Sequence, residues 1–76
     1  MDDLQARVVV RIRELAKAGR IPVSHLPDLA GVSRSHFWEV MGCRKSPTLQ
    51  WLERVAEALS VDAVEFLMPP KAKPKR

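Results

Sequence analysis

The segment of residues 23–47, VSHLPDLAGVSRSHFWEVMGCRKSP, constrains the fold more than any other part of this 76-residue chain. Its apolar residues have the spacing of two short helices, and Gly31 between them supplies the left-handed turn that ends the first helix. Leu26, together with Leu29 or Ala30, gives that helix an apolar face. The segment therefore predicts two short helices joined by a tight turn, with a polar face exposed on the second.

An apolar stripe at helical spacing precedes this segment and predicts a first helix over residues 3–18, which Gly19 ends. The stripe consists of Leu4, Val8, Ile12 and Leu15. Ser24 is placed to cap the second helix, which ends at Ala30, and Ser33 is placed to cap the third. The inward residues of the third helix are Phe37 and Val40.

Two more helices are expected further along the chain. Ser46 or Thr48 can cap a fourth helix. Its core stripe consists of Leu49, Leu52, Ala56 and Leu59. Asp62, with Glu65 three residues later, resembles a capping box and opens a fifth short helix, which two prolines stop. We therefore expect an all-α, compact five-helix bundle that forms one domain over residues 1–70.

The excess of positive charge lies at the carboxyl-terminal end. The net charge is +4, and four cations fall within residues 71–76, which leaves nine Lys and Arg against nine Asp and Glu in residues 1–70. We expect residues 71–76 to be a disordered basic tail that follows a DNA backbone, enters a minor groove or only aids solubility. Because the folded body is formally neutral, nucleic-acid affinity has to come from locally placed cations and this tail.

Composition argues against several other classes. No run of about 18 apolar residues is present, so we expect no membrane span. The acidic start, followed by Arg11 and Arg13, is unlike a secretory signal and favours the cytoplasm. Cys43, the single cysteine, is expected to be small and half-buried. Two histidines, His25 and His36, do not make a metal site, and no catalytic constellation is present, so neither a cofactor nor an enzymatic activity is expected.

Two motifs, LPDLAGVSRSHF and SPTLQWLERVAEALSVDAVEFL, together resemble the lambda repressor and Cro-like helix-turn-helix family, also called XRE-type. The positions in step with the family pattern are Leu26, Gly31, Val32, Ser33, Pro47, Leu49, Leu52, Ala56, Ala58, Leu59 and Val61. The resemblance covers residues 4–68. It implies a helix-turn-helix over about residues 24–42, a third helix that reads the major groove of double-stranded DNA, and a homodimer.

Several positions depart from the family pattern. Pro27 stands where alanine is usual, and Met41-Gly42-Cys43 stands where members have E-x-G. Ala16 aligns with an arginine that pairs with that glutamate in many members. Both partners of that ion pair are therefore replaced here, and we expect an apolar contact between Ala16 and Met41, an exchange that is often neutral or stabilising.

The outward face of the third helix carries the candidate base-reading residues Arg34, Ser35, Trp38 and Glu39. Arg34 can donate two hydrogen bonds to guanine, and its alternatives are stacking on Trp38 or contact with phosphate alone. Glu39 can accept from cytosine N4, or it is solvated or paired with a cation within the protein. Trp38 can contact a thymine methyl or a sugar, or it is a packing lid.

Contacts with the DNA backbone are expected from the start of the second helix, from the third helix and from the segment after it. The residues are Ser24, His25, Ser33, His36, Arg44, Lys45 and Ser46. Arg20 adds a further charge nearby. Trp51, Val55 and Phe66 form either a subunit contact or a part of the core, and the sequence leaves both open.

The function that these features predict is sequence-specific binding of double-stranded DNA by a dimeric transcriptional regulator. The resemblance favours a repressor or autoregulator of a phage or prokaryotic operon, without a small-molecule ligand. The alternative is a protein-interaction module, such as an antitoxin-like or anti-repressor domain, which Trp38, Glu39, Trp51 and the neutral body favour. The grouping of Arg34, Arg44 and Lys45 around one helix speaks against that alternative.

Overall fold

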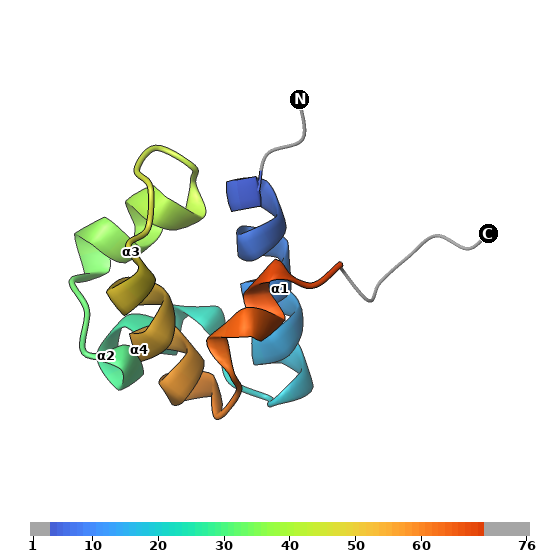
Figure 1. Cartoon of the computed structure of the whole chain (residues 1–76). Coiled ribbons are helices and arrows are strands. Elements are labelled where there is room, and N and C mark those ends of the chain that lie inside the picture. Colours follow the sequence, from blue (N-terminus) through green and yellow to red (C-terminus); the bar gives the residue numbers. More distant parts are fainter. Residues whose placement is uncertain (1–3, 70–76) are drawn as a thin grey trace.

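The computed structural model describes residues 4–69, which contain helices and no strand. The elements in chain order are α1 (Leu4–Ala18), the 3₁₀-helix η1 (Val23–His25), α2 (Leu26–Ala30), α3 (Arg34–Met41), α4 (Leu49–Leu59) and the 3₁₀-helix η2 (Ala63–Leu67) (Figure 1). The predicted all-α architecture is therefore confirmed. The basic tail, residues 71–76, lies outside the described residues.

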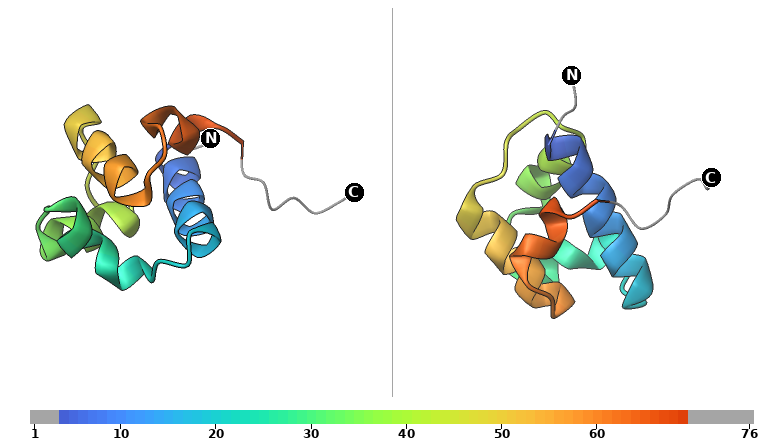
Figure 2. Two further views of the ribbon diagram at one scale, coloured as in Figure 1. Left: turned by 90° about the horizontal axis from the view of Figure 1, so that it is seen from below. Right: turned by 45° about the vertical axis from the view of Figure 1, so that its right-hand side comes forward.

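The last helical segment, η2, packs against α1, although the two are far apart in the sequence. Figure 2 shows them side by side in both of its views. The other main contact joins α2 to α4. In this arrangement α1 and η2 form one side of the molecule. The buried side chains of α3 pack into the core, which leaves the other face of this helix outside.

The expected fifth α-helix is a 3₁₀-helix instead, so the described residues contain four α-helices. Asp62 Oδ1 accepts the N–H of Val64 at 2.9 Å, as a cap should. Glu65 does not turn back to close a capping box, because its carboxylate bonds to Arg11. The N–H of Met68 donates to the carbonyl of Glu65 at 3.3 Å, which is the i to i+3 bonding of a tight turn.

The second helix starts differently from the prediction. Ser24 lies within η1, and α2 begins at Leu26 without a side-chain cap. The N–H of His25 donates to the carbonyl of Pro22 at 2.9 Å, and the N–H of Leu26 donates to that of Val23. Backbone carbonyls therefore satisfy the donors that a cap would satisfy, and the prediction that Ser24 caps this helix is wrong.

The caps of α3 and α4 are confirmed. Ser33 Oγ accepts the N–H of His36 at 3.2 Å, and Thr48 Oγ1 accepts the N–H of Trp51 at 3.0 Å. Gly31, with φ of 71°, ends α2 in the left-handed region that favours glycine. This glycine and the two caps fix the directions of α2, α3 and α4 relative to one another.

The core draws side chains from every helix and from η2. Its members are Val8, Val9, Ile12, Ala16, Leu26, Ala30, Phe37, Val40, Met41, Trp51, Leu52, Val55, Ala56, Leu59 and Phe66. Ala30, rather than Leu29, gives α2 its buried face. Leu4 and Leu49 were expected in the core but are 54% and 81% exposed. Each is the first residue of its helix, and its side chain points back past the end of the helix, where no turn covers it.

The structure places Trp51, Val55 and Phe66 in the core of the single chain, with 5%, 0% and 0% exposure. The ring centroid of Trp51 lies 5.9 Å from that of Phe37. Core packing therefore accounts for all three side chains. Of the two alternatives that the sequence left open, the core position is the one observed, because side chains buried in their own chain leave no surface for a subunit contact.

A buried arginine joins η2 to α1. Arg11 is 1% exposed, and its Nη1 and Nη2 donate to carboxylate oxygens of Glu14 and Glu65, both at 2.9 Å. Arg11 Nε also donates to the backbone carbonyl of Glu65 at 2.9 Å. These bonds compensate for the removal of the guanidinium from water and hold η2 in place.

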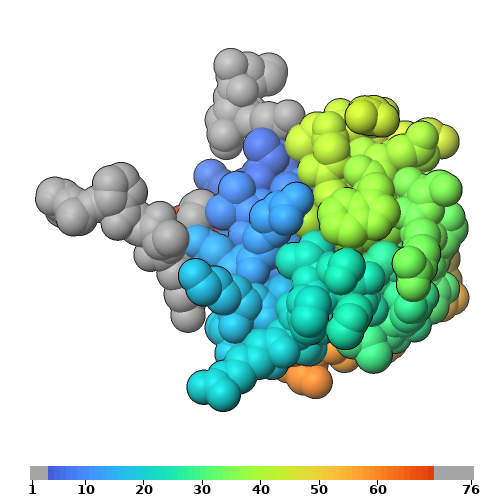
Figure 3. All heavy atoms as spheres, turned by 180° about the vertical axis from the view of Figure 1, so that it is seen from behind, coloured from blue at the N-terminus to red at the C-terminus, as the bar shows by residue number. Residues whose placement is uncertain are grey.

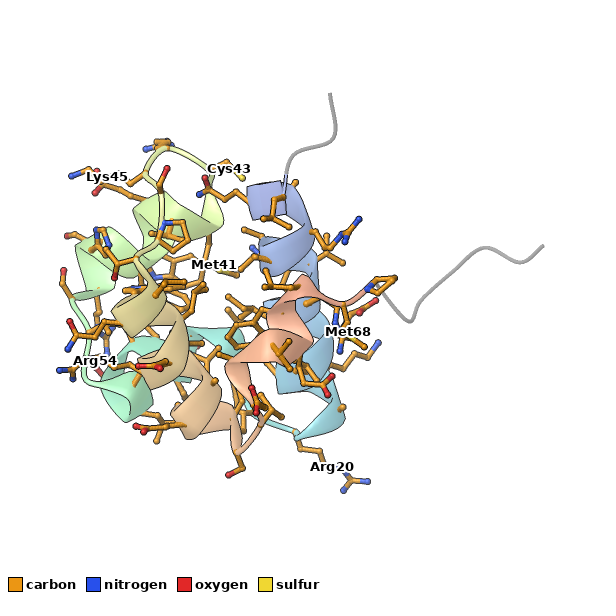
Figure 4. The ribbon with its side chains drawn as sticks, viewed as in Figure 1. Arg20, Met41, Cys43, Lys45, Arg54 and Met68 are labelled. Atoms are coloured by element: carbon orange, nitrogen blue, oxygen red, sulfur yellow. The ribbon has the colours of Figure 1, made fainter. Side chains whose placement is uncertain are left out.

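The ion pair that many family members place between helices one and three is replaced by apolar side chains. Ala16 and Met41 are 0% and 5% exposed and belong to the same core cluster. Figure 4 shows Met41 on the side of α3 that faces α1. Within residues 4–69, the buried arginine and its carboxylate partners lie at η2 rather than behind α3.

Candidate nucleic-acid interface

The outward face of α3 has the orientation that the helical wheel predicts. Arg34, Ser35 and Trp38 are exposed, whereas Phe37 and Val40 are fully buried. Figure 3 shows α1, α2, α3 and the loop after α3 on one continuous face of the molecule. The polar side chains of α3 are thus presented on a surface that other elements flank but do not cover.

Arg34 forms an ion pair that its spacing in the sequence does not suggest. Its Nη2 lies 2.8 Å from Oδ2 of Asp28 on α2, and the two side chains are 68% and 64% exposed. The pair therefore crosses the turn of the helix-turn-helix in open solvent.

Trp38 is packed on one side and exposed on the other. Its ring meets that of Phe37 edge to face, with 5.0 Å between centroids and 87° between planes. The side chain nevertheless keeps 43% of its surface exposed. One part of the ring thus rests against the core, and the remainder is available to a partner.

Glu39 is paired with a cation of the same chain, which is one of the alternatives that the sequence left open. Its Oε1 lies 3.5 Å from Nζ of Lys45. Its backbone carbonyl accepts the N–H groups of Arg44 and Lys45 at 2.8 and 3.3 Å. Gln5 of α1 donates from Nε2 to the carbonyls of Val40 and Lys45. The loop that carries the two cations is therefore tied both to α3 and to α1.

Cys43 is exposed, which contradicts the expected half-buried position. Its φ is 60°, so it occupies the left-handed position just beyond α3 where glycine is more usual. That conformation turns the chain out into the loop. Figure 4 shows Cys43 and Lys45 at the same end of the molecule.

The remaining backbone-contact candidates differ in their surroundings. Ser24, His25, Ser33, Arg44 and Ser46 are exposed, whereas His36 is half-buried with its ring 6.3 Å from that of Trp51. Arg20 is exposed too, but Figure 4 shows it at the opposite end of the view from Lys45. The cations after α3 therefore form a group that Arg20 does not join.

A further cation lies beside the turn of the helix-turn-helix. Arg54 of α4 approaches Gly31, and its Nη1 would be 3.9 Å from a Cβ atom at that glycine. A hollow of about 260 Å³ separates the turn from the start of α4. Its lining includes Ser33, His36, Thr48, Trp51 and Arg54. Arg54 is not among the site residues that the sequence predicts. Its position on α4, outside the core stripe of that helix, is the sequence feature that could have indicated a cation near the turn.

Comparisons with known proteins identify the fold. No protein-family model matches the chain, and no curated protein matches it. A crystal structure of a hypothetical transcription factor, NHTF from Neisseria, is 28% identical, with a TM-score of 0.81 over 91% of this chain and 79% of that chain. The restriction-modification controller protein C.AhdI from Aeromonas hydrophila is 26% identical, with a TM-score of 0.72 over 82% of this chain and 94% of that chain.

The chain has the lambda repressor/Cro-like helix-turn-helix fold. In this helix-turn-helix domain, α2 and α3 are the two helices of the motif, and Gly42 ends the second of them. None of the helices within residues 4–69 is both long and apolar enough to cross a membrane. The predicted helix-turn-helix resemblance is thus confirmed at the level of the fold.

Proposed function

We propose that the protein is a sequence-specific, double-stranded-DNA-binding transcriptional regulator that reads the major groove with α3. The observation that carries this proposal is the exposed row of Arg34, Ser35 and Trp38 on a helix whose other side is buried. The similarity to a hypothetical transcription factor and to a restriction-modification controller protein supports it. An α-helix fits the major groove of B-form DNA, where each base pair presents a distinct pattern of donors and acceptors.

The base-reading roles follow from the chemistry of each side chain. Arg34, the first residue of α3, donates from its guanidinium to O6 and N7 of a guanine. Ser35 contacts either a base edge or a phosphate. Trp38 places the exposed part of its ring against a thymine methyl or a sugar. Glu39 is a weaker candidate for cytosine N4 because it is paired with Lys45.

Contacts with phosphate supply the general affinity in this proposal. Arg44, Lys45 and Ser46 lie in the loop that α3 and α1 hold. Ser24 and His25 at η1 bind a second phosphate, and Ser33 and His36 bind near the start of α3. Because the body is formally neutral, such local cations rather than the overall charge attract the DNA.

The regulatory role that we propose is repression or autoregulation of a phage or prokaryotic operon. A small domain bound at a promoter blocks polymerase, and its own concentration then controls the outcome. This role places the protein in the cytoplasm, on nucleoid or phage DNA. No cofactor or small-molecule ligand enters the proposal.

Selection from a random duplex library at about 150 mM salt tests the proposed function, because phosphate contacts alone weaken steeply with salt. We expect the selection to enrich a motif that requires at least one guanine in each half-site, that is, in each of the two DNA segments that the subunits of a dimer would contact. Enrichment of no motif, with equal binding to all duplexes, would contradict sequence-specific reading.

A protein-interaction module is the second candidate function, and one observation favours it. Trp38 keeps an exposed aromatic surface at the centre of α3, which is typical of residues that contribute strongly to protein interfaces. Trp51, which the sequence also offered for this role, is buried. Enrichment of a motif in the duplex selection would decide against this candidate.

We also propose that the protein acts as a homodimer through η2 and the residue after it. Val64, Leu67 and Met68 are 53%, 41% and 46% exposed, although the rest of the segment is anchored to α1. Two-fold dimers of helix-turn-helix domains read half-sites about one helical turn apart, roughly 34–36 Å. An apolar surface at the carboxyl-terminal side fits such an arrangement.

Replacing Leu67 with glutamate is expected to weaken self-association at least about tenfold, because a two-fold interface would lose the burial of the 41% exposed part of Leu67 from both subunits and would gain two carboxylates. Sedimentation equilibrium without DNA measures the effect. Leu29→Glu is the control, because Leu29 is 58% exposed on α2, and its substitution should leave association unchanged. A wild-type protein that stays monomeric at about 100 μM, where even weak specific association is populated, would contradict the dimer.

A further inference from the structure

We infer that Asp28 is a specificity-determining residue that holds the Arg34 guanidinium and disfavours its contact with DNA phosphates. This inference rests on the proposed function, in which Arg34 reads a guanine. It adds a role for a residue on α2 that does not itself have to touch a base. The ion pair between Asp28 Oδ2 and Arg34 Nη2, at 2.8 Å, is the observation that carries it.

The two ends of this pair are fixed by the turn between them. Asp28 precedes Gly31, whose N–H donates to the Asp28 carbonyl at 3.3 Å, and Arg34 follows the capping residue Ser33. Gly31 adopts a left-handed conformation, and Ser33 bonds to the first turn of α3. Because the backbone on both sides is held, the carboxylate and the guanidinium start within reach of each other, and only the two side chains have to be ordered when the pair forms.

The pair leaves the guanidinium able to read a base. A guanidinium has five N–H donors, and the bond from Arg34 Nη2 to Asp28 uses one of them. Other donors on the same plane can still meet O6 and N7 of a guanine in parallel. Both side chains are more than 60% exposed, so the pair lies on the surface that DNA would approach.

The carboxylate affects phosphate and guanine differently. A phosphate is an anion, so Asp28 repels it and also neutralises the cation that would attract it. A guanine edge carries no net charge and is not repelled to the same degree. Arg34 held by Asp28 therefore gains little from phosphates at any sequence and retains its bond to guanine, which raises the ratio of specific to nonspecific affinity.

The opposite end of α3 shows a related but looser arrangement. Glu39 Oε1 lies 3.5 Å from Lys45 Nζ, a longer separation than that of the Asp28–Arg34 pair. A lysine ammonium is a point charge without the planar fork that recognises a guanine. Asp28, which faces the arginine, is therefore the residue whose substitution should change the specificity ratio.

Asp28→Asn tests the inference, because it removes the charge and keeps the size of the side chain. The measured quantity is the Kd for the selected duplex against the Kd for a random-sequence duplex of the same length. We expect the ratio to fall about fivefold at about 150 mM salt, mainly through tighter nonspecific binding, since phosphate contacts dominate that binding. The thermal midpoint should change little, because both partners are exposed.

Glu57→Gln is the matched control, because it removes the same charge from an exposed position near the end of α4. It is expected to strengthen binding to both duplexes by the same factor and to leave the ratio unchanged. The substitution Asp28→Asn should have no effect on the ratio when Arg34 is already alanine. That double variant separates action through Arg34 from a general charge effect.

The outcomes distinguish the inference from the proposed function. If Asp28→Asn leaves the ratio within twofold of that of the wild type, or lowers it equally in the Arg34→Ala background, the inference fails and the function stands. If the wild-type protein binds every duplex equally, sequence-specific function fails and the inference fails with it. A ratio that falls only when Arg34 is present supports both.

Discussion

Replacing Arg34 with alanine is expected to lower the affinity for the selected duplex about 10- to 100-fold for each half-site, since one two-bond contact with guanine contributes roughly 1–3 kcal/mol of discrimination. The affinity for a random-sequence duplex should fall by a smaller factor, about fivefold or less, because the paired Arg34 gains little from phosphates and its removal leaves the Asp28 charge unbalanced. Fluorescence anisotropy with labelled duplexes at about 150 mM salt measures both constants.

Arg34→Lys is the informative companion variant. Lysine keeps the positive charge but lacks the planar fork that donates two parallel hydrogen bonds. We therefore expect it to resemble alanine on the selected duplex. Equal losses on the selected and random duplexes for Arg34→Ala would mean that Arg34 contacts only phosphate, the alternative that its position also allows.

Replacing Arg11 with alanine is expected to lower the free energy of unfolding by about 2–4 kcal/mol, because it removes a buried side chain and its hydrogen bonds but leaves carboxylates that water partly reaches. Arg11 is 1% exposed and donates to Glu14, to the Glu65 carboxylate and to the Glu65 carbonyl. Its removal takes away the donor to the carbonyl and carboxylate of Glu65 and opens space between α1 and η2. Urea denaturation followed by circular dichroism measures the change.

Two further variants separate the contributions to that loss of stability. Arg13→Ala replaces an exposed arginine on the same helix and should change stability by less than about 0.5 kcal/mol. Arg11→Met keeps much of the volume without the hydrogen bonds, so its difference from Arg11→Ala measures packing. A loss of less than about 1 kcal/mol for Arg11→Ala would contradict the structural role of this residue, because it would be typical of a surface substitution.

The sequence predicts the helices well wherever the signals are local. The extents of α1, α3 and α4 follow from apolar spacing and from capping residues. Ser33 and Thr48 act as caps because the bonds that they make reach only three residues along the chain. The inward residues Phe37 and Val40 follow from the same periodicity.

The features that the sequence does not predict depend on what surrounds a residue in three dimensions. Leu49 has the periodicity of a core residue, but nothing covers the start of its helix. Arg11 has the charge of a surface residue, although it lies three positions after the buried Val8. Its partner Glu65 is 54 residues away, so no local pattern reveals the pair. Cys43 takes a conformation that sequence statistics assign to glycine.

The candidate site is predictable in outline but not in its pairing. The exposure of Arg34 and Trp38 follows from the helical wheel. The Asp28–Arg34 pair spans six residues across a turn, which is outside the spacing at which helical side chains meet. Only the angle that Gly31 sets between α2 and α3 brings the two together.

Methylation protection on the selected duplex tests groove reading by α3 most directly. Dimethyl sulfate modifies guanine N7, which lies in the major groove, and adenine N3, which lies in the minor groove. We predict that saturating wild-type protein protects at least one guanine N7 in each half-site, and that saturating Arg34→Ala protein leaves that atom reactive. Protection confined to adenine N3 would contradict the reading of DNA by this helix, and an N7 footprint that Arg34→Ala leaves unchanged would contradict the guanine contact of Arg34.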